Sequence, residues 1–226
     1  MLNDRVLFID GEAIIVDKPA GLPVDPSRDG SLSVENHLDS LRFGFQRFPL
    51  PVHRLDRDTS GCLMLARHPK AHKRFGQAFE AGTVSKLYVA VVDGVPDAAE
   101  GMIDIALAKL STRERGWWMA GDPKGKPART AWTLIAAAHG RALIAFRPET
   151  GRTHQIRVHA AEGLGHPIVG DPVYGRAGGS VGPDGVAMLL HARALSVPRE
   201  GKPPVAAVAP MPDSFVAAGF PDAPEA

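Results

Sequence analysis

Cysteine is nearly absent from this chain of 226 residues, in which Cys62 is the only one. A single cysteine excludes an internal disulfide and any cysteine-rich zinc module. The neighbours Gly61, Leu63 and Met64 favour a small core side chain over a reactive thiol at this position. We therefore expect neither redox chemistry nor a structural metal from this residue.

Long apolar runs are also missing. No stretch approaches the roughly 20 apolar residues that a membrane span needs. The first ten residues, MLNDRVLFID, lack the basic start and apolar run of a signal peptide. With 44% apolar and 23% charged residues, the composition is that of an ordinary globular protein. These features predict a cytoplasmic protein with no membrane partner.

The formal net charge is only +1, but the charge is unevenly distributed. Residues 42–74 carry eight Lys and Arg against two Asp, a net +6, and residues 109–129 carry a net +4. The end of the chain from residue 211 has a net −3. Concentrated basic charge suits a protein that binds a polyanion, although solvated helix and loop faces can have the same pattern.

The spacing of apolar residues predicts several elements. Residues 5–10 and 12–16 are apolar runs around Asp10-Gly11, which predicts a hairpin with a primed turn. We expect a short helix from residue 31, a helix that begins at Pro69 and stops at Gly82, and another from about residue 153 to 163. Strands are predicted over residues 84–94, 100–107, 129–138, 141–147 and, as the last core strand, 189–198.

One carboxylate occupies an unusual setting within residues 51–67, PVHRLDRDTSGCLMLAR. Asp56 precedes a turn-forming Asp-Thr-Ser-Gly, which leads into an apolar run at residues 62–66. This is the layout of a reactive carboxylate on a tight loop that enters a buried strand, with Arg54 and Arg57 to keep it ionised. A surface loop of mixed charge is the alternative interpretation.

The motif in this stretch resembles a known family. HRLDRDTSG matches HRLDxxTSG, the signature of the RluA-type pseudouridine synthases, at every specified position. Further segments are similar to the same family in the same order, and the resemblance runs from about residue 5 to about residue 215. These segments are IIVDKPAGLPV, KLYVAVVDG, KGKPARTAW, TGRTHQIRVHAAEGLGHPIVGDPVYG and LLHARALSVP.

The resemblance implies a fold. It is an α+β pseudouridine synthase catalytic fold, with a large mixed, mainly antiparallel sheet flanked by helices and a central cleft between two lobes. Residues 1–215 would form this catalytic domain, and residues 216–226 a flexible tail. The chain looks like a short form without the N-terminal S4-type module of some relatives, so RNA selectivity would come from the catalytic domain.

The resemblance also implies a reaction in which uracil is detached from ribose at N1 and reattached through C5. This isomerisation needs no cofactor and no metal. Asp56 would be the nucleophile, Arg157 would pair with it and orient it, and Tyr88 would stack on the target base. The residues expected to bind RNA or to flip the base out of its stack are Arg54, His53, Arg57, Arg152 and Lys86.

The expected partner is structured RNA, either ribosomal RNA, transfer RNA or both, and not DNA, and the expected state is a monomer. The sequence leaves open which uridine is modified, whether Asp56 attacks C1′ or C6, and what Trp117, Trp118 and the basic segment 109–129 do. Two alternatives are a catalytically silent RNA-binding protein of the same fold and a metal-dependent hydrolase. The latter would use His154, His159 and His166, or the pair His68 and His72.

Overall fold

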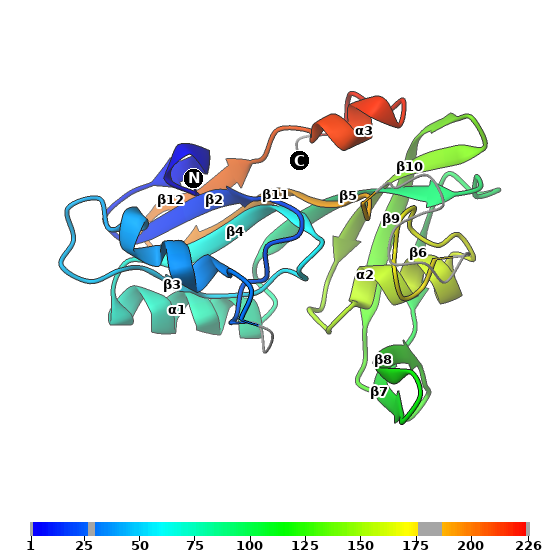
Figure 1. Ribbon diagram of the computed structural model, residues 1–226, viewed down its shortest axis with the longest axis horizontal. Coiled ribbons are helices and arrows are strands. Elements are labelled where there is room, and N and C mark those ends of the chain that lie inside the picture. Colours follow the sequence, from blue (N-terminus) through cyan, green and yellow to red (C-terminus); the bar gives the residue numbers. More distant parts are fainter. Residues whose placement is uncertain (1, 27–29, 176–186, 225–226) are drawn as a thin grey trace. The chain divides into compact units, whose positions relative to one another are not determined.

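The computed structural model describes residues 2–26, 30–175 and 187–224, and the chain divides into two compact units (Figure 1). Among these residues, unit 1 consists of residues 2–86 and His191–Pro210. Unit 2 consists of Leu87–Leu190 and Met211–Pro224. Each unit has its own hydrophobic core.

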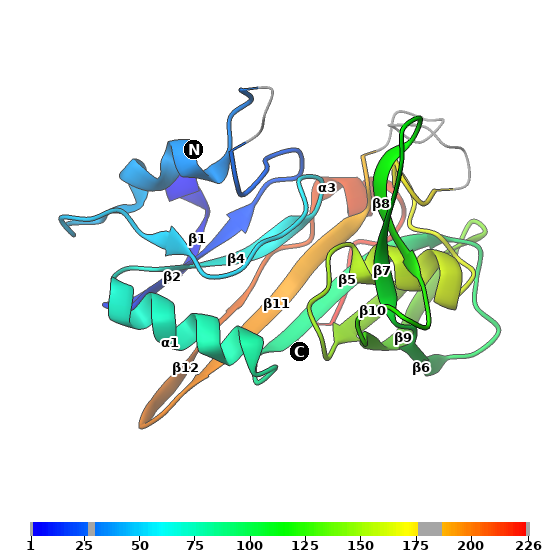
Figure 2. The same cartoon turned by 90° about the horizontal axis from the view of Figure 1, so that it is seen from below.

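Unit 1 is built on strands in the order β1 (Val6–Ile9), β2 (Ala13–Lys18), β4 (Ser60–Ala66) and β11 (Leu190–Arg199). β12 (Lys202–Val208) pairs with β11, and β3 (Leu50–Pro51) pairs with β4. Neighbours are antiparallel except β4 and β11, which are parallel. Helix α1 (Pro69–Glu80) lies along these strands (Figure 2), and its Ala71 and Phe75 share a core with Ile15, Met64 and Val197. Two short 3-10 helices, η1 (Leu2–Arg5) and η2 (Val34–Leu41), complete the unit.

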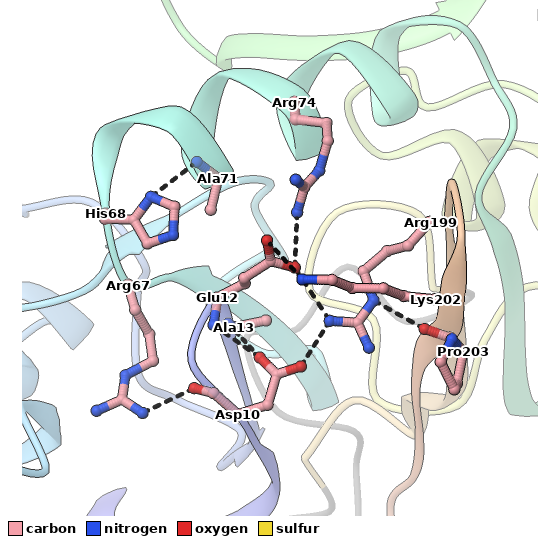
Figure 3. A network of polar contacts seen from close by, with 10 residues as sticks. All are labelled: Asp10, Glu12, Ala13, Arg67, His68, Ala71, Arg74, Arg199, Lys202 and Pro203. Carbon is pink, nitrogen blue, oxygen red and sulfur yellow. Dashed lines mark hydrogen bonds and ion pairs between the residues drawn. The ribbon is translucent and has the colours of Figure 1, made fainter.

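The predicted hairpin at Asp10-Gly11 is confirmed, but the primed turn is wrong, because neither residue has a positive φ. Instead, the Asp10 carboxylate closes the turn by accepting hydrogen bonds from the backbone N–H groups of Glu12 and Ala13, at 2.8 and 2.9 Å. Arg199 on β11 pairs with both Asp10 and Glu12, while Arg74 on α1 pairs with Glu12 at 2.9 Å (Figure 3). The hydrogen bond from Arg74 holds the pKa of Glu12 below its ordinary value. The hairpin is therefore fixed by ion pairs to a strand and to a helix that are distant in the sequence.

Unit 2 is built on strands in the order β5 (Ser85–Asp93), β10 (Arg141–Pro148), β9 (Arg129–Ala138) and β6 (Glu100–Asp104), all antiparallel. Successive side chains of β5 point to opposite faces. Ala90 and Val92 pack with Ile156 and Ala160, which come from α2 (Gln155–Val158) and its continuation η3 (His159–Gly163). Val89 and Val91 pack with Phe215 of α3 (Asp213–Ala217), so that both faces are covered.

Several expectations about unit 2 and the end of the chain need correction. The predicted strand over 100–107 is two strands, since β6 ends at Asp104 and β7 (Leu107–Thr112) forms a separate hairpin with β8 (Gly116–Gly121). The strand over 189–198 is not the last one, because β12 follows it. The tail expected from residue 216 contains Phe220, which is 2% exposed in the core of unit 2. The last two residues of that tail lie outside the described part of the chain.

The fold class is confirmed as α+β with mainly antiparallel strands and few helices. The helices predicted from residue 31, from Pro69 and from about residue 153 are present as η2, α1 and α2–η3, although η2 begins at Val34 and α2 at Gln155. None of the helices in the described part of the chain is both long enough and apolar enough to cross a membrane.

Candidate active site

Asp56 stands in unit 1, on the loop between β3 and β4, and is half-buried. Its backbone carbonyl accepts a hydrogen bond from the Thr59 N–H at 3.1 Å, which closes the turn that the sequence predicted. Thr59 is 2% exposed, so the turn is anchored in the unit. The carboxylate is therefore carried by a fixed loop and not by a mobile surface segment.

Gly61 directly follows this loop, at the point where β4 meets β11. Its φ is +104°, and a Cβ atom would lie 2.3 Å from the carbonyl oxygen of Ala192. Gly61 and Ala192 are register partners in the parallel pair, so the two backbones approach closely where the loop enters the strand. Only glycine provides both this conformation and this space.

We expect Gly61→Ala to lower the free energy of unfolding by about 3 kcal/mol or more, because it adds both backbone strain and a clash with a main-chain oxygen. Urea denaturation followed by circular dichroism measures the effect. Gly76→Ala in α1 is the control, since a Cβ there meets nothing within 4 Å. That variant should be neutral or stabilised by up to about 1 kcal/mol. Equal unfolding midpoints for the two variants would contradict this account of Gly61.

Lys18 is a residue of this region whose role was not predicted from the sequence. It lies at the end of β2 and is fully buried. Its ammonium group donates hydrogen bonds to the carbonyl oxygens of Pro19, Leu22 and Arg57, at 2.9, 2.8 and 3.0 Å. The Gly21 N–H also donates to the Arg57 carbonyl at 2.9 Å. Lys18 thus ties the Lys-Pro-Ala-Gly segment to the residue that follows Asp56.

Burial lowers the pKa of Lys18 to about 8, although the negative charges of Asp58 and Asp56 favour the charged form. The group is therefore protonated at pH 7 and loses its proton as the pH rises through 8. A neutral amine has two N–H donors for three carbonyl acceptors, so one hydrogen bond is lost. The only sequence signal for this role was the resemblance of IIVDKPAGLPV to the family, which gave the lysine no partner.

We expect the turnover of the wild-type protein to fall between pH 7 and 9 with an inflection near 8, because deprotonation of Lys18 loosens the Asp56 loop. Lys18→Met should lower turnover about tenfold at pH 7, since a hydrogen bond to a charged group contributes about 1.5–3 kcal/mol. The variant should also lack the inflection. Turnover rates measured across this pH range on one RNA substrate provide the test. An identical inflection in Lys18→Met would show that another group titrates.

His53 lies at the start of the Asp56 loop, and its side chain is held by contacts within unit 1. Its Nε2 accepts a hydrogen bond from the Met64 N–H at 2.9 Å, and its ring stacks on Phe79 of α1 with centroids 4.5 Å apart. Burial, together with the charge of Lys86, lowers the pKa of His53 to about 3, so the ring is neutral. Burial also lowers the pKa of Lys86. For both residues, the predicted contact with RNA stays a prediction.

The two arginines beside Asp56 differ in their surroundings. Arg54 pairs with Asp25 at 2.7 Å, and both side chains are largely exposed. An exposed ion pair contributes about 0–1 kcal/mol, so Arg54 can exchange this partner for another anion at little cost. The guanidinium of Arg57 pairs with Asp58, while its carbonyl accepts from Lys18. Arg57 thus contributes its backbone to the loop and its side chain to the surface.

Arg157 lies in unit 2 on α2 and is 5% exposed. Its Nε and Nη2 donate to the two carboxylate oxygens of Asp171, both at 2.8 Å. One of these oxygens also accepts from the backbone N–H groups of Val173 and Tyr174. Asp171 therefore fixes the plane of the guanidinium by a bidentate pair. Asp171 lies within a segment similar to the family but had no predicted role. The predicted pairing of Arg157 with Asp56 stays a prediction.

An aromatic cluster surrounds this arginine within unit 2. The guanidinium carbon of Arg157 lies 5.1 Å from the centre of the Tyr174 ring, and the Tyr174 hydroxyl is 2.9 Å from Nδ1 of His154. His154 in turn stacks on Trp117 of β8, at 5.3 Å. The β7–β8 hairpin is thus packed against the helix that carries Arg157. This gives Trp117 a packing partner, and Trp118 lies under Arg115 at 4.4 Å.

The remaining predicted residues of unit 2 also have defined positions. Tyr88 is half-buried on β5, opposite Phe146 of β10, at the edge of the core beside α2. Arg152 precedes α2 and donates to the carbonyl of Pro127 at 3.0 Å, with its own N–H held by Gln155. The buried Gln155 also donates to Arg129 and Thr130. This amide therefore anchors the loop that leads to Arg157.

The histidines considered for a metal site have separate partners. His154 lies beside Tyr174, His159 bonds Thr130 at 2.9 Å, and His166 bonds the carbonyl of Asp93 at 2.8 Å. Within residues 2–26, 30–175 and 187–224, no group of three or more His, Cys, Asp or Glu side chains could hold a metal ion. The clustering in sequence that suggested a hydrolase is thus not a clustering in space.

Comparison with known proteins gives a consistent result. A family model described as RNA pseudouridylate synthase matches residues 12–162. The chain is 57% identical over 221 residues to an uncharacterized RNA pseudouridine synthase of Zymomonas mobilis, which covers 97% of this chain and 99% of that protein. It is 37% identical over 200 residues to the dual-specificity RNA pseudouridine synthase RluA of Escherichia coli, covering 85% of each.

The fold is similar to that of a solved structure of human RNA pseudouridylate synthase domain containing 4. The TM-score is 0.78 at 26% sequence identity, and the match covers 95% of this chain and 91% of that one. Sequence and structure are therefore similar to the same group of proteins over nearly the full length of the chain.

Proposed function

This chain belongs to the RNA pseudouridylate synthase family, and from that premise we propose that Asp56 is the nucleophile, with Tyr88 and Arg157 as the other catalytic residues. The protein is an isomerase that converts uridine in RNA to pseudouridine. The reaction breaks the bond between C1′ of ribose and N1 of uracil and forms a bond between C1′ and C5. The hydrogen at C5 leaves as a proton, and N1 takes up a proton from solvent.

The observation that carries the proposal is the construction of the Asp56 loop. A carboxylate is an adequate nucleophile when it is ionised, partly desolvated and aimed. Asp56 is half-buried, its own carbonyl is held by Thr59, and the carbonyl of the next residue is held by the Lys18 ammonium group. The negative charge of Asp56 in turn favours the charged form of the Lys18 ammonium group.

We assign the other two roles from the resemblance and from the surroundings of each residue. The bidentate pair with Asp171 fixes the orientation of Arg157, as required of a cation that must hold a reacting carboxylate in one geometry. Tyr88 is half-buried at the edge of an apolar core, a position that suits a ring that stacks on a base. Neither role requires a metal or a cofactor.

Access to the target base requires that the uridine leave its stack, which costs a few kcal/mol. We propose that Arg54 occupies the vacated space, because its exposed pair with Asp25 is weak and can be exchanged. Arg57 and Arg152 are proposed to contact phosphates near the target. Lys86 and His53 are proposed to support this surface from partly buried positions.

We further propose that the substrate is a structured ribosomal or transfer RNA and that the protein acts as a monomer of 24.0 kDa. The relative in Escherichia coli is named a dual-specificity RNA pseudouridine synthase, so we test both RNA classes. To test this, separate transcripts of both classes are incubated with the protein, and pseudouridine is located by carbodiimide modification and primer extension. One strong stop at a single uridine in at least one class is expected, and no stop in either class would contradict the proposal.

A further inference from the structure

An exposed segment that follows η2 and ends at the first residue of β3 combines aromatic side chains with arginines. We call residues 42–50, RFGFQRFPL, the aromatic loop. It extends away from the strands of unit 1 and forms the light-blue loop at the left edge of Figures 1 and 2. Phe43, Phe45 and Phe48 are 46%, 38% and 47% exposed, and Leu50 is 44% exposed. Isolated exposed apolar residues are ordinary, but several in one loop indicate an interaction surface.

Arg67 fixes the shape of this loop. The side chain lies directly after β4, is 7% exposed, and donates hydrogen bonds to the carbonyl oxygens of Arg42 and Phe43, at 2.9 and 3.0 Å. Its other terminal nitrogen donates to the Asp10 carbonyl at 2.7 Å (Figure 3). The guanidinium carbon also lies 3.7 Å from the centre of the Phe45 ring. A buried cation with these bonds holds the loop in one conformation.

The backbone of the loop is also unusual. Phe43 has a φ of +44°, in the left-handed region that bulky side chains rarely adopt, and Gly44 follows at +85°. A conformation of this kind costs about 1–2 kcal/mol and persists only where the surroundings enforce it. Here the enforcing contact is the bond from Arg67 to the Phe43 carbonyl. The structure thus maintains a strained backbone that leaves the Phe43 ring nearly half exposed.

The charges around the loop indicate what kind of molecule binds there. Residues 40–55 contain three arginines and no acidic residue. Arg42 and Arg54 pair with Asp39 and Asp25 from outside this range, whereas Arg47 is exposed at the tip of the loop. Aromatic rings interleaved with cations form platforms on which unpaired bases stack while the cations neutralise phosphates. We propose that the aromatic loop is an RNA-binding surface, on which unpaired bases of the substrate stack on Phe43 and Phe48 while Arg47 pairs with phosphate. This inference rests on the proposed function only in taking RNA as the substrate.

The position of the loop determines which part of the RNA it binds. The Asp56 loop enters β4 at Ser60, whereas the aromatic loop is held by Arg67 at the opposite end of the strand. The seven residues of β4 span about 20 Å at about 3.3 Å per residue. The bases on Phe43 and Phe48 are therefore not the target uridine but nucleotides at a distance from it. Their loss should weaken binding without slowing the chemical step.

The test compares variants on one fluorescently labelled transcript, namely a ribosomal or transfer RNA that the wild-type protein binds. Phe43→Ala and Phe48→Ala should each weaken the apparent affinity about tenfold, since stacking of one base contributes about 1–3 kcal/mol. The single-turnover rate at saturating protein should stay within about twofold of wild type. Arg47→Gln should make the plot of log association constant against log salt concentration less steep, by a slope of about one.

Two controls make the result decisive. Ile9→Ala removes a side chain that is equally exposed, at 44%, from β1 of the same unit, and should leave the RNA affinity unchanged. Phe43→Asn removes the ring with a residue that tolerates a positive φ, so that it retains the fold even if Phe43→Ala does not. Unchanged affinity in Phe43→Asn and Phe48→Ala would overturn the inference. The same holds if these variants only dissociate a dimer that the wild-type protein forms.

The outcome is independent of the catalytic assignment. If the wild-type protein forms no pseudouridine, the proposed function fails, while the affinities of the same variants for the same RNA still decide the role of the aromatic loop. If pseudouridine forms normally and all affinities are equal, only the inference about the loop fails.

Discussion

Asp56→Asn is expected to abolish pseudouridine formation while the fold and the RNA affinity remain. The amide has nearly the shape of the carboxylate but no negative charge, so it cannot act as a nucleophile or stabilise a positive sugar. Removal of a catalytic nucleophile lowers the turnover number by about 10⁴-fold or more. Single-turnover assays with excess protein measure the chemical step without interference from product release.

Asp58→Asn is the matched control, because it removes a carboxylate from the same loop two residues later. The Asp58 carboxylate pairs with the exposed Arg57 side chain, and this pair is expected to contribute little. The loss of activity should therefore be less than about tenfold, which corresponds to about 1.4 kcal/mol. The assignment of Asp56 would be refuted if Asp58→Asn inactivated the protein while Asp56→Asn did not.

Asp171→Asn is expected to have the second largest effect, on both stability and rate. The Asp171 side chain is fully buried, and the substitution leaves the charge of Arg157 buried without its carboxylate. Breaking a buried ion pair in this way costs about 3–5 kcal/mol of unfolding free energy. The catalytic rate should fall about 100-fold, because a small displacement of a positioning group costs that much.

Thermal unfolding measures the effect on stability, and single-turnover assays measure the effect on rate. The assays are performed well below the unfolding temperature of the variant. Asp93→Asn is the control in unit 2, since Asp93 forms a longer and partly exposed pair with Arg141, at 3.7 Å. It should change the unfolding free energy by less than about 1 kcal/mol. If Asp171→Asn unfolds like the control and retains full activity, the pair with Arg157 has no importance for either property.

Much of this architecture could be predicted from local patterns in the sequence. Alternation predicted β5, and Pro69 and Gly82 marked the ends of α1. The strands predicted over 129–138 and 141–147 are β9 and β10. The turn after Asp56 followed from the turn-forming residues 58–61, and Gly61 indeed has a positive φ. These features depend on neighbours in the chain, so the sequence contains their signal.

Other features depend on partners that are distant in the sequence. The role of Lys18 requires a carbonyl 39 residues away, and that of Asp171 requires an arginine 14 residues before it. Most of β7 is exposed and β8 has an irregular burial pattern, so the hairpin has no regular alternation to detect. The edge strand β12 contains two prolines, which argue against a strand when the pairing is unknown. Residue types alone did not contain this information.

The central claim is that the protein uses Asp56 to replace the bond between ribose C1′ and uracil N1 in RNA with a bond between C1′ and C5. The most direct measurement is the release of tritium from ribosomal and transfer RNA transcripts labelled at C5 of uridine, because the new bond forces this hydrogen into solvent. The account predicts that the wild-type protein releases one tritium for each pseudouridine formed and that Asp56→Asn releases none. The account would be contradicted if the wild-type protein bound these RNAs with a strong dependence on salt but released no tritium, as expected of a catalytically silent RNA-binding protein.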